Sequence, residues 1–248
     1  MNHIILKIKS SKLVNQGFIK KIKDKIYFKY IDPKLQGKTD RYRNEILDRL
    51  YEMLGDTKWM LSCGGFLRYY RDQSMDGQDL DIYMLTDDLE RMLPTFIANG
   101  FLIKQIFYNM EGELTEYRLL YKDVEVDIFH IFHDETGYYH YFTLEDNAKP
   151  SPQITRKVEG NQLIVEGPDY ISWRRHLPDF EVQTYEFEGS KFKGPKNAVS
   201  NIVALYGESW QVYDPHFDPR REPVNNRPVP VPGAKSVVFT KPVKSIKD

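Results

Sequence analysis

The sequence LSCGGFLRYYRDQSMDGQDLDIYML covers residues 61–85 and contains the features on which the expected fold depends. A short apolar run there ends in Gly64-Gly65, which predicts a buried strand followed by a tight turn. Thirteen residues separate the glycine pair from Asp79-Leu80-Asp81-Ile82. Polar and apolar residues alternate in this second stretch, as they do in a strand that has one buried face.

The two acids of this stretch are expected to act together. Asp79 and Asp81 project from the same face of the strand because residues two apart point the same way. Adjacent carboxylates repel each other, so the pair is costly unless a cation lies between them. Oxygen ligands suit Mg²⁺, which binds one or two carboxylates together with substrate phosphates. We therefore expect Asp79 and Asp81 to bind Mg²⁺ or Mn²⁺.

A third acid occurs in the stretch Val124-Glu125-Val126-Asp127-Ile128-Phe129. Its apolar residues at alternate positions form one face, and Asp127 points the other way. An acid within a buried strand needs a partner, and a metal shared with Asp79 and Asp81 would supply one. Beside that metal, Asp127 is a candidate general base for an attacking hydroxyl. The alternative is that Asp127 pairs with an Arg or Lys and that the Asp pair lies at a solvated strand end.

The surrounding sequence predicts an α/β (α+β) fold with a mixed sheet and flanking helices. Apolar spacing predicts helices over residues 43–54, 87–99 and 197–206. Strands are expected over residues 59–63, 80–85, 101–107, 115–121 and 124–132. Residues 133–160 are expected to be rich in loops.

The two ends of the chain differ from its centre. Residues 1–43 contain ten Lys, two Arg and three Asp, a net charge of +9, so the other residues carry −10. Isoleucines placed among these lysines predict a β-hairpin-like pair of surface strands, and the charge could also bind a phosphate or a polyanion. Residues 213–248 are expected to form an extended tail, because seven of the fourteen prolines lie in the last 34 residues.

Composition excludes several classes of protein. Of the 248 residues, 41% are apolar, which is enough for a core and argues against a disordered chain. Lys and Arg (35) nearly balance Asp and Glu (36), so we expect no nucleic acid partner. Cys63 is the single cysteine, which excludes an internal disulfide framework. We see no signal peptide and no apolar run long enough to span a membrane, and we expect a cytoplasmic protein.

The glycine pair, the Asp-apolar-Asp-apolar strand and the later acid resemble the pattern of the nucleotidyltransferase superfamily related to DNA polymerase β. The resemblance implies a nucleotidyltransferase-like sheet with Asp79, Asp81 and Asp127 as catalytic metal ligands. Gly64 and Gly65 would let backbone N–H groups approach a phosphate. Arg68 and Arg71 follow at helical spacing and would clamp a diphosphate. The alternative for these arginines is an ordinary ion pair with nearby acids.

A narrower resemblance covers residues 44–215. The run Leu61–Met84, the later Asp127-Ile128-Phe129 and the element Tyr206-Gly207 after a helix are similar to the LicD/fukutin family. The catalytic domain is accordingly expected over residues 44–212. Where that family has Pro-Trp-Asp before its Asp pair, this chain has Asp76-Gly77-Gln78, which leaves the transferred group open.

The family resemblance implies a transferase of polysaccharide biosynthesis. Its enzymes move phosphocholine or a polyol phosphate from a CDP-linked donor to a hydroxyl of a cell-surface glycan. One alternative is a nucleotidyltransferase that places NMP on a small molecule or protein, with another nucleotide as donor. A second alternative is a non-catalytic module that binds an anionic polymer through the basic N-terminal segment. The sequence does not fix the nucleotide base, the acceptor or the oligomeric state.

Overall fold

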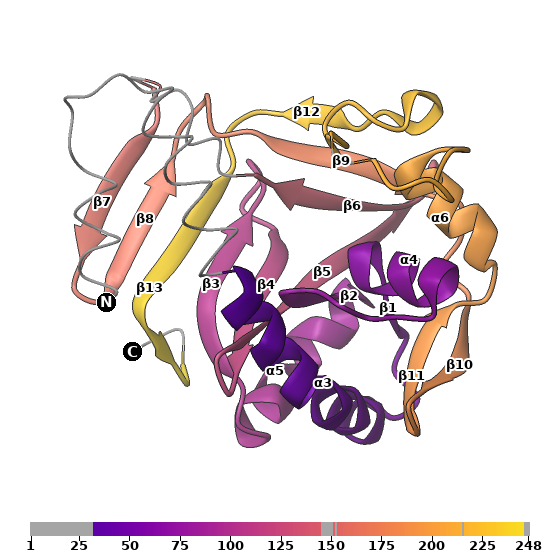
Figure 1. Cartoon of the computed structure of the whole chain (residues 1–248). Helices are drawn as coiled ribbons and strands as arrows, with labels where there is room; N and C mark the ends of the chain where they lie inside the picture. The colour runs from indigo at the N-terminus through magenta and orange to yellow at the C-terminus, as the bar shows by residue number, and fades with distance from the viewer. Residues whose placement is uncertain (1–31, 145–150, 152, 215, 246–248) are drawn as a thin grey trace.

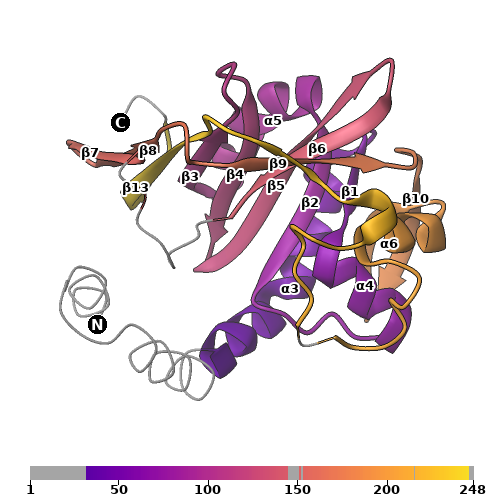
Figure 2. The same cartoon turned by 90° about the horizontal axis from the view of Figure 1, so that it is seen from above.

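A computed structural model describes residues 32–144, 151, 153–214 and 216–245. They form a mixed α+β structure in which helices pack against one large sheet (Figures 1 and 2). The surface strands expected near the N-terminus lie in residues 1–31, outside the described part. Among the described helices, none combines the length and hydropathy needed to cross a membrane.

The helices and strands have the following bounds. The helices are α3 (Asp32–Leu54), α4 (Cys63–Asp72), α5 (Thr86–Ala98), α6 (Ala198–Tyr206) and the 3₁₀ helix η2 (Val224–Asn226). The large sheet contains β1 (Trp59–Leu61), β2 (Asp79–Leu85), β3 (Leu102–Tyr108), β4 (Leu114–Tyr121), β5 (Val124–Asp134), β6 (Gly137–Thr143), β7 (Thr155–Glu159), β8 (Gln162–Glu166), β9 (Ser172–Leu177), β12 (Val229–Val231) and β13 (Lys235–Val243). A separate hairpin consists of β10 (Val182–Phe187) and β11 (Ser190–Pro195).

The sheet order is β12-β9-β6-β5-β4-β3-β13-β8-β7, and β2 lies beside β5 with β1 on its far side. The β2–β5 pair is parallel, whereas every other pairing of the described strands is antiparallel. The mixed sheet expected from the sequence is therefore present. The parallel pair matters most here, because both of its strands carry acids.

The core forms on the apolar face of these central strands. Leu80 and Ile82 of β2 are fully buried, as are Val126 and Ile128 of β5. They pack in one cluster with apolar residues of α3 and α5. Burying a side chain of this size contributes about 1.5–3 kcal/mol. Because side chains alternate along a strand, this burial directs the acids of β2 and β5 to the opposite face.

Helix α3 begins earlier than the apolar spacing predicts. The expected boundary between residues 43 and 44 falls inside the helix, so the basic segment is not a strand over residues 32–43. Two residues of the added part make contacts distant in sequence: the Thr39 hydroxyl donates to the Gln78 carbonyl (2.8 Å), and buried Arg43 lies over the Phe187 ring. The spacing of apolar residues along the sequence gives no information about such polar contacts.

Two further expectations are corrected by strands. The expected loop region at residues 133–160 contains β6 and β7. In β6 the run Tyr138–Phe142 is aromatic and has high β propensity, which outweighs the turn residues around it. The expected extended tail contains a regular strand of the large sheet, because β13 pairs with both β3 and β8. Val237 and Phe239 of β13 are buried, and this apolar pattern matters more than the nearby prolines.

Candidate functional site

Three neighbouring strands bring charged residues into one row. In the parallel pair, Asp81 of β2 lies opposite Asp127 of β5, and Asp79 lies opposite Glu125. On the other side of β5, Asp127 lies opposite Arg118 of β4. Figure 1 shows β2, β5 and β4 side by side. The register therefore assembles the three acids predicted from the sequence and adds a cation beside them.

The acids of this row are difficult to ionise together. Burial raises the pKa of Asp81 well above its ordinary value, and Asp79 and Asp127 raise it further by repulsion. The pKa of Asp127, whose side chain is buried, is raised to about 6, mainly by burial. Asp79, at the strand start, is exposed, but the protein around its carboxyl group displaces part of its hydration, and this and then Glu125 raise its pKa. A cation near Asp79 and Asp81 would relieve this repulsion.

Asp127 already has a cationic partner. The Arg118 Nε lies 3.0 Å from Asp127 Oδ1 and 3.2 Å from Oδ2. The alternative raised for this residue, a pair with an Arg or Lys, is thus the arrangement in the structure. Within the described ranges, no three His, Cys, Asp or Glu side chains are arranged to hold a metal ion. The role of Asp127 as a metal ligand therefore stays a prediction, and its partner in the structure is Arg118.

Arg118 also contacts two other acids that the sequence analysis did not single out. Its Nη2 lies 3.3 Å from Glu116 Oε1, and its Nε lies 3.6 Å from Glu125 Oε2. Glu116 is buried, and its pKa is raised to about 8, chiefly by burial and then by Asp127. The signal was present in the alternation of Glu116 and Arg118 along the predicted strand, which places both side chains on one face.

The glycine pair begins helix α4 instead of forming a tight turn. The Ser62 N–H donates to the Asp81 carbonyl (2.9 Å), which fixes the start of α4 beside β2. No side chain of the described residues caps this end, and its first turn has no acid. The N–H groups of a helix start favour anions, so the Gly64 and Gly65 amides are suited to a phosphate.

Arg68 is directed toward the acids. A Cβ on Gly64 would lie 2.9 Å from Arg68 Nη1, and a Cβ on Gly77 would collide with the same guanidinium. Both glycines therefore leave room for this side chain. Arg68 lowers the pKa of Asp79 and of Asp81 by its charge. Its Nε is buried and has no hydrogen-bond partner among the residues described. Arg68 is thus a cation available to a ligand at the start of α4.

Arg71, in contrast, is occupied elsewhere. Its Nε and Nη2 donate to the two oxygens of Asp72 at 2.9 and 2.8 Å, and its Nη1 donates to the Trp210 carbonyl at 3.2 Å. The ordinary ion pair considered as an alternative applies to Arg71. Of the two predicted arginines, the structure thus brings Arg68 to the acids and leaves Arg71 with Asp72.

Another residue near the acids is Tyr206, at the last position of α6. The phenol is half-buried, and its pKa is raised well above the ordinary value by burial and by the proximity of Cys63 and Asp81. Its motif was noted in the sequence, but no role was assigned to it. Tyr206 therefore forms part of the wall near Asp81.

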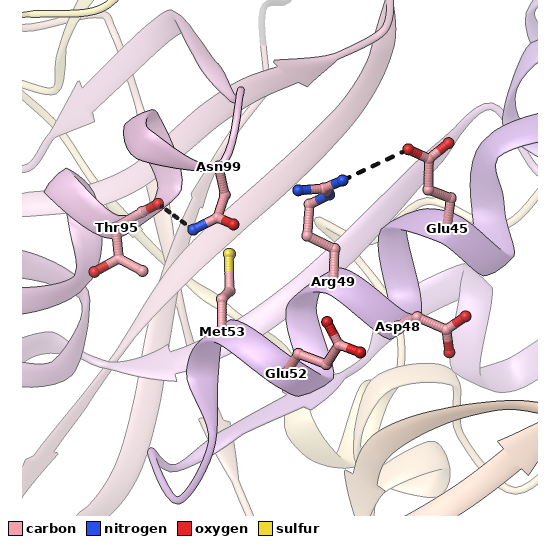
Figure 3. A pocket seen from close by; sticks show the side chains of 7 residues that line it. All are labelled: Glu45, Asp48, Arg49, Glu52, Met53, Thr95 and Asn99. Carbon is pink, nitrogen blue, oxygen red and sulfur yellow. Dashed lines mark hydrogen bonds and ion pairs between the residues drawn. The ribbon is translucent and has the colours of Figure 1, made fainter.

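Two surface hollows lie away from the acidic row. One of about 470 Å³ is lined by residues of α3 and α5 (Figure 3). Its lining residues are Glu45, Asp48, Arg49, Glu52, Met53, Thr95 and Asn99. The other, of about 580 Å³, lies at the start of α6 and includes Tyr70 of α4 and Tyr185 of β10. Neither hollow includes any of the three predicted acids.

No known family model matches the chain, and no curated protein matches it.

Proposed function

We propose that the protein is a Mg²⁺- or Mn²⁺-dependent transferase that moves a phospho-substituent from a CDP-linked donor to a glycan hydroxyl. One observation carries the proposal: Asp79 and Asp81 project from one face of β2, and both the start of α4 and the Arg68 guanidinium lie beside them. Acids for a cation thus lie next to donors for a phosphate. The similarity of these motifs to the LicD/fukutin family supplies the reaction class and the nucleotidyltransferase-like interpretation of the fold.

The residues have distinct parts in this reaction. The Gly64 and Gly65 amides and Arg68 bind the donor diphosphate, and Asp79 and Asp81 hold the divalent cation. When bound, that cation supplies charge neutralisation at the phosphate. Arg71 supports α4 through Asp72 and Trp210 in the structure, which does not favour the donor-binding role expected of it.

Transfer requires one proton acceptor. The acceptor hydroxyl oxygen forms a bond to the phosphorus of the transferred group, the bond between that phosphorus and CMP breaks, and CMP leaves. The hydroxyl proton passes to a carboxylate of Asp127, whose pKa of about 6 is close to that of a useful base. A carboxylate has about four lone-pair sites, so Asp127 can contact Arg118 and still accept a proton.

The test is a thermal-shift panel with Mg²⁺ and CDP, CTP, UDP or GDP on the wild type and on the Asp79→Ala/Asp81→Ala variant. A ligand that binds only the folded state raises its stability. We expect a Mg²⁺-dependent rise in Tm with cytidine nucleotides alone, lost in the double variant. A rise with another nucleotide would favour NMP transfer. No rise with any nucleotide would contradict both enzymatic functions.

A further inference from the structure

The interaction of Arg118 with Asp127 bears on how many acids can hold a cation. The two residues lie opposite each other on adjacent strands, and Nε contacts both carboxylate oxygens at 3.0 and 3.2 Å. This bond is charge-assisted and partly buried, which makes it stronger than an exposed ion pair. A cation that recruits Asp127 must first displace the guanidinium.

Arg118 is held in place from several sides. Its Nη2 donates to Glu116 and its Nη1 donates to Gln105 at 3.4 Å. Its guanidinium also lies over the Phe107 ring, 5.5 Å from the centroid. If Arg118 moved away, the buried Glu116 carboxylate would lose its cationic partner. The neighbours of Arg118 therefore oppose its displacement.

The Asp pair of β2 has no such partner. Neither Asp79 nor Asp81 forms an ion pair with any residue in the described part of the chain, although Arg68 lies near both. Among the described residues, the acids of the row without an ion pair are thus both on β2. This difference between β2 and β5 separates the acids into two groups with different partners.

We propose that a divalent cation binds this protein through Asp79 and Asp81 without Asp127, and that Arg118 is the positioning residue that keeps Asp127 out of the ligand set. The proposal rests on the proposed function, because it assumes that the acidic site takes a cation. It differs from the three-acid site implied by the resemblance. In this structure the partner of Asp127 is the Arg118 guanidinium.

The test measures Mn²⁺ affinity and stoichiometry by electron paramagnetic resonance, without nucleotide or turnover. We expect Asp81→Asn to weaken Mn²⁺ binding by about 100-fold or more, because it removes a ligand. Asp127→Asn should change the affinity by less than about fivefold, because the charge removed is already paired. An equal loss in both variants would overturn this inference and leave the proposed function standing. Failure of the wild type to bind Mn²⁺ would contradict both.

Variants of Arg118 test its positioning role. Arg118→Gln should tighten Mn²⁺ binding by about tenfold, because Asp127 then becomes available. Arg118→Lys retains the charge and should keep the wild-type affinity. Unchanged affinity in Arg118→Gln would overturn the role. Because Arg118→Gln leaves Glu116 unpaired and could unfold, the Glu116→Gln/Arg118→Gln variant provides the same comparison with both charges removed.

Discussion

Asp81 of β2 and Asp127 of β5 are direct neighbours across a pair of parallel strands. Like charges at such positions destabilise a sheet. The structure compensates one of them with Arg118 and leaves the other beside Arg68. The metal-free protein is therefore expected to be less stable than its apolar core alone would allow, and this has measurable consequences.

Asp81→Asn should separate stability from activity. The amide cannot ionise, so we expect it to relieve repulsion and raise the Tm of the metal-free protein by roughly 2–4 °C, for about 1 kcal/mol. The same change should abolish turnover and the rise in Tm caused by Mg²⁺. Calorimetry with and without Mg²⁺ measures both effects. Near-normal turnover in this variant would show that Asp81 does not bind the metal.

Stability of the metal-free protein should fall as pH rises from about 6.5 to 8. Glu116 has its pKa raised to about 8, so the folded state retains a proton there that the unfolded chain has lost. The contribution of Glu116 to stability is largest below the pKa it has in the unfolded chain, and it is lost as the pH rises through its pKa in the folded protein. Between pH 6.5 and 8 the loss is about 1–2 kcal/mol. Below pH 6.5 the buried His130 and His140 oppose this trend, because burial lowers the pKa of each to about 3.

Thermal unfolding in EDTA across this pH range measures the slope. Glu116→Gln should reduce the slope, and the part that remains belongs to Asp81, whose pKa is raised well above its ordinary value by burial. Glu125→Gln, which removes a more exposed acid of the same cluster, serves as the matched control and should retain it. A slope of unchanged size in Glu116→Gln would show that Glu116 does not carry the retained proton.

Arg68→Ala and Arg71→Ala should affect nucleotide binding differently. Arg68 faces Asp79 and Asp81, so its loss should weaken nucleotide binding about tenfold or more, the effect of one charge-assisted contact. Arg71 is bound to Asp72 and the Trp210 carbonyl, so its loss should change affinity by less than about threefold. Isothermal titration with Mg²⁺ and the nucleotide that stabilises the wild type gives both values. The reverse order would place the diphosphate near Arg71.

The glycine pair should tolerate alanine at one position and not the other. A Cβ at Gly64 would press on the Arg68 guanidinium, a flexible group that can move away. Gly64→Ala should therefore fold but lose nucleotide affinity, as Arg68→Ala does. A Cβ at Gly65 meets Leu61 Cδ1 at 3.5 Å, an ordinary contact. Gly65→Ala should bind normally and gain up to about 1 kcal/mol in stability as a helical alanine. Equal binding by both variants would contradict the placement of Arg68.

Much of the central fold was predictable from local patterns. The alternation in Asp79-Leu80-Asp81-Ile82 identified both the strand and its buried face, because burial of Leu80 and Ile82 leaves a single orientation for the acids. The same reasoning placed Asp127 on the acidic face. Local patterns do not predict which strands pair, because the register depends on contacts between residues far apart in the sequence.

The missed parts of the site share this cause. Arg118 became the partner of Asp127 only through the β4–β5 register, and no spacing near Asp127 indicates it. Arg68 and Arg71 look equivalent in the sequence, but their surroundings differ: glycines beside Arg68 leave it space, and Asp72 captures Arg71. Likewise, Thr39 of α3 donates a hydrogen bond to a residue 39 positions away, which no local spacing indicates.

The place of β13 in the sheet has a consequence for synthesis. Among the described residues this is the last strand in chain order, yet it lies between β3, near the middle of the sequence, and β8. On the ribosome, β3 must wait with one edge unpaired until residues 235–243 have been made. Exposed edges of this kind invite pairing with other chains, and such long-range closure is slow. Newly made protein should therefore depend on chaperones until β13 has left the ribosome and paired with β3.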